Sequence, residues 1–137
     1  MDCIYCGTKT SVTNSRPQKR LRQVWRRRHC PKCNAIFTTL EAVDFSTSLV
    51  VTYKGGKLQP FSRDQLFLSV IKVCGHRKTA QKDASGLTNT ILSRLYPLIT
   101  NGSIETDSIA KTAHSVLKRF DKASSVQYAA YHTNALG

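Results

Sequence analysis

Four cysteines are spaced as two pairs that together could bind a metal ion. The pairs are Cys3-x-x-Cys6 and Cys30-x-x-Cys33, with 23 residues between Cys6 and Cys30. Two intervening residues let one tight turn present both sulfurs to the same ion, and two such turns complete the tetrahedral Cys₄ shell typical of structural zinc. Two disulfides, or one redox CxxC motif beside two structural cysteines, are the alternatives. Neither a signal peptide nor a thioredoxin-like βαβ pattern is evident, which favours one Zn²⁺ per chain.

Positive charge is concentrated between the two cysteine pairs. The chain has 137 residues and 21 Lys+Arg against 8 Asp+Glu, a formal net charge of +13. Residues 1–41 hold nine basic and two acidic residues, a net +7, and the other 96 residues hold twelve and six, a net +6. Such a dense basic segment favours a nucleic acid partner. The candidate contact residues are Arg16, Arg20, Arg22, Trp25, Arg26, Arg27 and Arg28.

The arginine run has a second interpretation, because basic residues on an edge strand also prevent aggregation. Three consecutive arginines with further cations nearby exceed that need, and guanidinium groups bind phosphates bidentately and recognise guanine edges. Trp25 could pack on a sugar or support the arginine stems. Composition alone does not separate DNA from RNA.

A second candidate site is the cationic turn Lys54-Gly55-Gly56-Lys57, which lies between two short apolar stretches. A flexible basic turn can approach a triphosphate. Gly-Gly turns with flanking lysines are also ordinary hairpin turns, and the P-loop pattern is absent. These residues by themselves leave both interpretations open.

The elements that must position these groups fall into two halves. Residues 1–41 alternate as strands do, which predicts a small antiparallel β zinc ribbon. Residues 49–53 and 58–61 predict a β-hairpin closed by the cationic turn. About four helices follow, the first opened by the capping box Ser62-x-x-Gln65 and the others over about 83–101, 106–120 and 125–132. The fifth cysteine, Cys74, lies in the first helical pattern and is expected to be a small buried side chain.

The predicted fold class is therefore α+β, with a zinc ribbon over residues 1–45 and a hairpin capped by about four helices over 46–137. The length excludes large enzyme scaffolds, and the four histidines lie far apart in the sequence, so no enzyme is expected. The longest apolar runs are too short to cross a membrane, and a cytosolic protein without a membrane partner is expected.

Taken together, the motifs resemble the NrdR family, the bacterial zinc-ribbon and ATP-cone repressors of ribonucleotide reductase genes. The resemblance spans nearly the whole chain in the family's order. Its segments are Met1–Cys6, Asn14–Arg16, Trp25–Cys30, Ile36–Glu41, Val51–Gly56, Gln59–Phe61, Gln65-Leu66, Glu105–Ile109 and Asp121–Ala130.

The resemblance implies a repressor in the bacterial cytoplasm, associated with the nucleoid. Its ribbon would bind double-stranded operator DNA upstream of ribonucleotide reductase genes, and its cone would bind ATP or dATP and thereby control homo-oligomeric state. The implied nucleotide-binding residues are Val51, Lys54, Gly56, Lys57, Gln59, Pro60, Phe61 and Gln65. The retained phosphate candidates are Lys54 and Lys57, whereas Val51 and Phe61 could equally serve as hairpin core.

Several cone positions depart from the family pattern. Tyr53 and Gln65 stand where the family has lysine, Gly55 where it has Asp, Gln59 where it has Glu, and Gln127 where it has Arg. Where the family's lysine would contact phosphate, its replacement here removes a charge-assisted hydrogen bond worth roughly 1.5–3 kcal/mol. The alternative function is a basic zinc-ribbon protein that binds RNA or a ribonucleoprotein as a structural component, with a degenerate cone.

Overall fold

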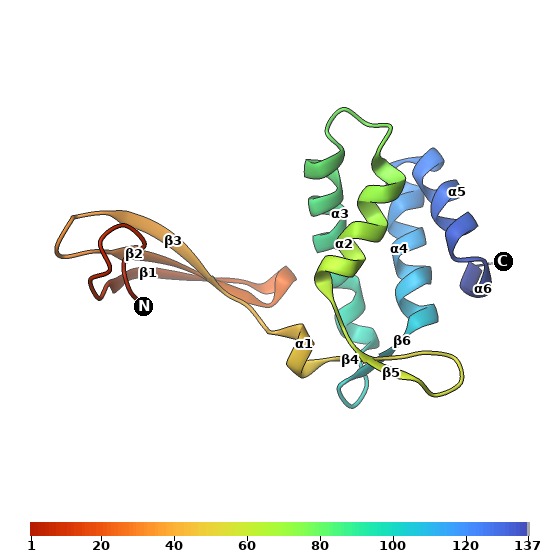
Figure 1. Ribbon diagram of the computed structural model, residues 1–137, viewed down its shortest axis with the longest axis horizontal. Coiled ribbons are helices and arrows are strands. Elements are labelled where there is room, and N and C mark those ends of the chain that lie inside the picture. Colours follow the sequence, from red (N-terminus) through yellow and green to blue (C-terminus); the bar gives the residue numbers. More distant parts are fainter. Residues whose placement is uncertain (137) are drawn as a thin grey trace. The chain divides into compact units, whose positions relative to one another are not determined.

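The computed structural model describes residues 1–136, which form two compact units (Figure 1). The first spans Met1–Val43 and the second begins at Asp44. The α+β class predicted from the sequence is confirmed, since an antiparallel sheet is followed by a helical unit with a small sheet of its own. The assignment of DNA binding to one unit and nucleotide sensing to the other stays a prediction.

The first unit is a three-stranded antiparallel sheet in the order β1-β2-β3. β1 is Ser11–Gln18, β2 is Gln23–His29 and β3 is Ile36–Glu41. The 3₁₀ turn η1 (Lys19–Leu21) joins the first two strands, and a bulge lies between Val12 and Asn14 of β1. Within residues 1–43 the only buried side chains are those of Cys3, Thr10 and Cys30. So small a core cannot by itself stabilise the unit.

The sheet of the second unit combines a hairpin with a strand from much later in the chain. Strands β4 (Val50–Thr52) and β5 (Leu58–Pro60) are antiparallel, and β6 (Ser103–Glu105) pairs in parallel with β4. Gly55 and Gly56 adopt φ values of 90° and 85°, a left-handed conformation that favours glycine, and so close the hairpin turn. The short α1 (Phe45–Ser48) leads into β4.

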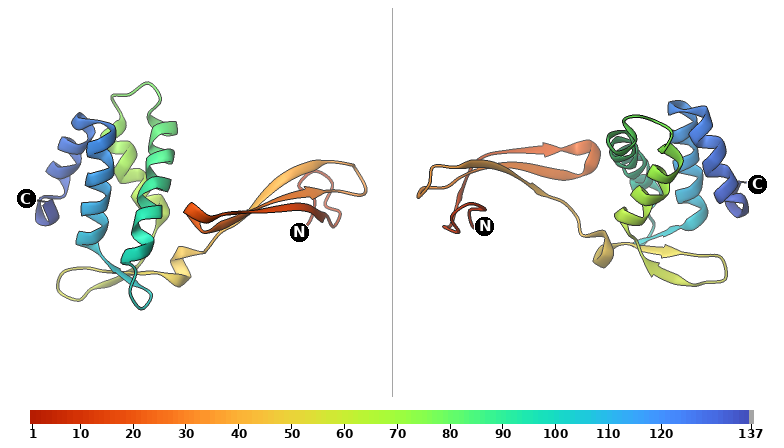
Figure 2. Two further views of the ribbon diagram at one scale, coloured as in Figure 1. Left: turned by 180° about the vertical axis from the view of Figure 1, so that it is seen from behind. Right: turned by 45° about the horizontal axis from the view of Figure 1, so that its top comes forward.

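Four longer helices pack beside one another on one side of this small sheet (Figures 1 and 2). Helix α2 contacts α3 and α5, and α4 contacts the same two helices. The helical segments are α2 (Arg63–Cys74), α3 (Ala80–Leu95), the 3₁₀ turn η2 (Tyr96–Leu98), α4 (Thr106–Phe120), α5 (Lys122–Tyr131) and the short α6 (Thr133–Leu136).

The core of the second unit joins the sheet to all four long helices. Val51 and Ile104 contribute from the sheet, and Val70, Ile91 and Leu117 from three of the helices. Cys74 also lies in this core and is fully buried, as expected for a small apolar side chain. Among the described residues, no helix combines the length and apolar character needed to cross a membrane.

Several boundaries differ from the predicted ones. The second long helix begins at Ala80 rather than near Asp83, because Asp83 is bonded by Thr79 and Arg77 within the first turn. The last long helix begins at Lys122 rather than Ser125, because Asp121 caps it by accepting a hydrogen bond from the backbone of Ser124. Neither α1, α6 nor the parallel strand β6 was expected.

Candidate metal centre and ligand sites

The two cysteine pairs converge on one point in the first unit. Sγ of Cys3 lies 3.7 Å from Sγ of Cys33, and Sγ of Cys6 lies 3.5 Å from Sγ of Cys30. All four sulfur atoms lie within 4.8 Å of one another. A tetrahedral zinc ion with Zn–S bonds of about 2.3 Å requires S–S separations of about 3.8 Å, so the cluster fits that ion. No position of the shell is left open for a substrate, which indicates structural zinc.

The backbone of each pair forms the tight turn that this geometry needs. The carbonyl of Cys3 accepts from the N–H of Gly7, and that of Cys30 accepts from the N–H of Asn34, both at 2.9 Å. Gly7 and Asn34 have φ values of 76° and 58°, which are left-handed. Glycine and asparagine tolerate that conformation best, which explains their place directly after the second cysteine.

The pKa values of Cys6 and Cys33 shift in opposite directions. Hydrogen bonds from the side chain and the backbone N–H of Thr8 lower the pKa of Cys6 to about 6. At Cys33 the backbone N–H of Ala35 favours the thiolate, yet desolvation and the three neighbouring thiols outweigh it and raise the pKa of Cys33 to about 12. A divalent cation removes this conflict, because it stabilises all four thiolates at once.

The consecutive arginines of β2 have unlike surroundings. Arg26 donates to Oγ of Ser15 at 2.8 Å and lies 3.7 Å from the carboxylate of Glu41. Arg28 donates to Oγ1 of Thr39 at 3.3 Å and of Thr10 at 3.5 Å. Two of the predicted DNA contacts are thus engaged inside the ribbon.

The other predicted DNA contacts lie along β1, β2 and the turn between them. Trp25 is half-buried, and the side chains of Arg16 and Arg27 are exposed. These two arginines make no side-chain hydrogen bond or ion pair within residues 1–136. Arg20 lies in η1, and Arg22 ends that turn with a left-handed φ of 49°.

The second unit contains a hollow of about 180 Å³ between the hairpin and the helices. Four of the eight predicted nucleotide-binding residues line it, namely Val51, Pro60, Phe61 and Gln65. Val51 and Phe61 are also members of the hydrophobic core, so their two proposed roles coincide. The volume is below the range of about 300–1,000 Å³ typical of sites that enclose a whole ligand. It therefore suits one ring system, with any phosphate chain outside.

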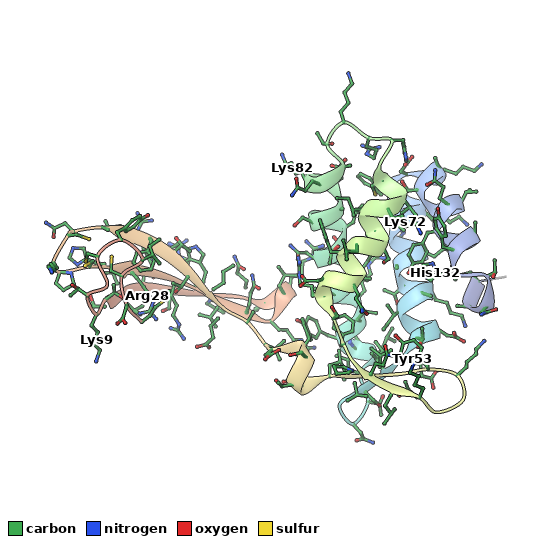
Figure 3. All side chains as sticks on the ribbon, in the orientation of Figure 1. Lys9, Arg28, Tyr53, Lys72, Lys82 and His132 are labelled. Carbon is green, nitrogen blue, oxygen red and sulfur yellow. The ribbon has the colours of Figure 1, made fainter. Side chains whose placement is uncertain are left out.

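Side chains outside the set of predicted nucleotide-binding residues complete this hollow. Tyr53 lies in the hairpin, directly after β4, and His132 directly follows α5 (Figure 3). The His132 ring stacks on that of buried Tyr128, with centroids 4.0 Å apart, and burial raises the pKa of Tyr128 to about 12. Thr106, at the start of α4, lines the hollow and bonds the carbonyl of Thr52 at 3.0 Å. Only packing of sequence-distant elements brings these groups together.

Lys54 points into a neighbouring depression of about 190 Å³ and not into the first hollow. Its Nζ lies 3.5 Å from Oδ2 of Asp107 and donates to the carbonyl of Asn134 at 3.1 Å. Tyr53 and Thr106 line both depressions and so join them. The remaining predicted residues, Gly56, Lys57 and Gln59, line neither.

Comparison with known proteins gives matches over both units. A family model described as "Transcriptional repressor NrdR-like, N-terminal domain" matches residues 1–41. Transcriptional repressor NrdR 3 of Paramagnetospirillum magneticum is 32% identical over 135 residues, which cover 98% of this chain and 87% of the relative. Transcriptional repressor NrdR of Rhodospirillum rubrum is 32% identical, with 98% and 88% covered. Transcriptional repressor NrdR of Oceanobacillus iheyensis is 31% identical, with 96% and 83% covered.

Proposed function

The chain belongs to the NrdR family of transcriptional repressors, as its motifs indicated, and from that premise we propose that it is a nucleotide-responsive repressor of ribonucleotide reductase genes. The observation that carries the proposal is the extent of the similarity, which reaches 98% of the chain and therefore includes the ribbon and the helical unit alike. The role is regulatory and not enzymatic. In this proposal the protein acts in the bacterial cytoplasm, at the nucleoid.

In this proposal the ribbon binds double-stranded operator DNA. Its zinc ion holds the two cysteine turns together, and the net charge of +7 over residues 1–41 attracts the phosphate backbone. Arginines supply bidentate bonds to phosphates and guanine edges. The zinc site has a structural role and not a catalytic one, because the four cysteines leave no coordination position open for a substrate.

The helical unit senses ATP or dATP. The hollow lined by Phe61, Tyr53 and the stacked pair Tyr128 and His132 suits a planar base, and hydroxyl groups from Ser62 and Thr106 lie at the same site. The phosphates extend toward Lys54 or Lys57. Because lysines expected from the family pattern are absent at Tyr53 and Gln65, we expect weak phosphate binding.

Nucleotide binding controls repression by changing the homo-oligomer. Coupling requires that nucleotide bind one assembly more tightly than another, since a ligand of equal affinity shifts nothing. Light scattering with ATP, with dATP and without nucleotide should show a change in mass. An unchanged mass at saturating nucleotide would leave the helical unit with a packing role only.

Sequence-specific DNA binding is tested by competition. A duplex from the promoter of the host's ribonucleotide reductase genes should stay bound in excess random duplex of equal length. Equal affinity for the promoter and random duplexes, or tighter binding of single-stranded RNA, would contradict the repressor and favour a structural RNA-binding role.

A further inference from the structure

The two faces of the ribbon sheet differ in composition. Successive strand residues point to opposite faces, and residues directly paired across strands point to the same one. The pairing register thus defines one face, here called the Trp25 face, by the cross-strand rows Arg16–Trp25–Leu40 and Asn14–Arg27–Thr38. The opposite face, here called the Arg28 face, carries Ser15–Arg26–Thr39 and Val12–Arg28–Phe37.

The Arg28 face is occupied by contacts within the ribbon. Arg26 is held by Ser15 and Glu41, and Arg28 spans from Thr39 to Thr10, which follows the first cysteine turn and donates to the carbonyl of Met1. The ring of Phe37 meets that of Tyr5 edge-on, with centroids 6.3 Å apart, so the same cysteine turn also packs on this face. The charge of Arg26 is offset in part by the Glu41 carboxylate.

The Trp25 face is open and carries uncompensated positive charge. In β3 the side chains that point to it, including Thr38 and Leu40, are exposed, whereas Phe37 and Thr39 on the other face are half-buried. Arg16 of β1 lies directly opposite Trp25 of β2, and Arg27 follows Trp25 by two residues in β2. Neither arginine has a side-chain partner among the described residues. None of the strand residues on this face is Asp or Glu.

We propose that the Trp25 face is the surface that docks on duplex DNA, with Arg16 and Arg27 as the phosphate contacts. Trp25 lies between them and packs on the sugar-phosphate backbone. Arg26 and Arg28 are positioning residues, which hold the strands and the first cysteine turn in place. Charge complementarity identifies the occupant, because unpaired arginines around an aromatic ring suit a polyanion. The choice of duplex DNA as the ligand rests on the proposed function. Within the triplet, Arg27 contacts DNA, whereas Arg26 and Arg28 stabilise the ribbon.

Two matched double variants separate the faces. Arg16→Ala with Arg27→Ala, and Arg26→Ala with Arg28→Ala, each remove two positive charges. For the first variant we expect the slope of log K against log salt to flatten by about two, because each phosphate contact contributes about 0.9. Its affinity for duplex should fall on the order of tenfold per arginine. The second variant should keep the wild-type slope, provided that its zinc content and circular dichroism show a folded ribbon.

Trp25 offers an independent readout that needs no substitution, because it is the only tryptophan in the chain. Its fluorescence should change as duplex is added to the wild-type protein. The Kd obtained from this titration should equal the Kd measured by the anisotropy of a labelled duplex. Unchanged emission at saturation would overturn the proposal. So would an equal loss of slope in a folded Arg26→Ala and Arg28→Ala variant.

The outcomes for the face and for the repressor are distinguishable. If the wild type binds promoter and random duplex equally, the repressor proposal fails, and the two slopes still decide which face contacts DNA. If it prefers the promoter and both variants lose the same slope, the repressor stands and the face assignment is wrong. Tighter binding of a single-stranded RNA of equal length would overturn the choice of duplex DNA.

Discussion

The four cysteine sulfur atoms of the ribbon, by binding zinc, must supply the folding free energy that a hydrophobic core supplies in larger domains. Two of its three buried side chains are the ligands Cys3 and Cys30. Zinc binding is worth about 10–16 kcal/mol in zinc-finger peptides, far more than three buried side chains supply. The second unit has its own apolar core and does not share this dependence.

Replacing Cys30 with Ala should abolish zinc binding and unfold the ribbon while the helical unit stays folded. Cys30 is fully buried, so its loss removes a ligand that no solvent-facing group can replace. Zinc content per chain and the strand signal in circular dichroism provide the measurement. Cys74→Ala is the control, because it removes a buried thiol from the other unit and should leave one zinc per chain. A full complement of zinc in Cys30→Ala would contradict the Cys₄ site.

Asp121 is a charged residue that links two helical elements of the second unit. Its Oδ2 accepts from Oγ of Ser124 at 2.6 Å and lies 2.8 Å from Nε2 of His76, so it caps α5 and ties it to the turn that follows α2. The bonds from Ser124 and then from His76 lower the pKa of Asp121 below its ordinary value of 3.8, against an opposing desolvation effect. A lowered pKa means that the carboxylate stabilises the fold above that ordinary value.

Asp121→Ala should therefore lower the melting temperature of the helical unit at neutral pH by a few degrees, as loss of a helix cap does. The difference from wild type should be present at neutral pH and should vanish as the pH falls through the lowered pKa of Asp121. Asp64→Ala is the control, since that carboxylate is exposed. A difference that persists unchanged in strong acid would show that lost packing, and not lost charge, is responsible.

The two lysines of the β4-β5 hairpin that could bind phosphate, Lys54 and Lys57, have different surroundings. Lys54 is already held by Asp107 and the carbonyl of Asn134, whereas the side chain of Lys57 is exposed and has no partner in the part of the chain that the structure describes. Partly exposed ion pairs are worth only about 0–1 kcal/mol, so a triphosphate can displace Asp107 from Lys54 at small cost.

Asp107→Asn should accordingly raise the affinity for ATP a few fold, because it frees Lys54 and removes a negative charge near the phosphates. Lys54→Ala should lower the affinity on the order of tenfold. Calorimetric titration with ATP and dATP measures both, and Lys111→Ala, at an exposed site elsewhere on α4, is the matched control. Unchanged affinity in Lys54→Ala would exclude this lysine as a phosphate contact.

Most elements were predictable because their signals are local. The Ser62 cap, whose Oγ accepts from the backbone N–H of Gln65 at 3.1 Å, and the Gly55-Gly56 turn are encoded within a few residues. Strand β6 was not, because three residues pair with a strand about 50 positions earlier and have no pattern of their own. The hollow is equally non-local, since His132 and Thr106 reach it only after the helices pack. Which arginines remain free likewise depends on strand register, which composition does not reveal.

At the scale of the whole molecule, the proposed repressor requires that the ribbon and the helical unit act together on DNA binding. In the proposed function the ribbon, with its net charge of +7 over residues 1–41, binds nucleic acid, and the hollow of the helical unit binds a small ligand. In the proposed repressor these sites communicate through oligomeric state, which sets how many ribbons meet DNA together. Binding of nucleotide and of DNA must then be linked, and each must alter the affinity for the other by the same factor.

The most direct test is the Kd of the full chain for a labelled promoter duplex, measured by anisotropy in excess random duplex with ATP, with dATP and without nucleotide. The account predicts that the promoter is preferred over random duplex and that Kd differs between nucleotide states. Equal Kd values for promoter and random duplex in all three conditions would contradict it.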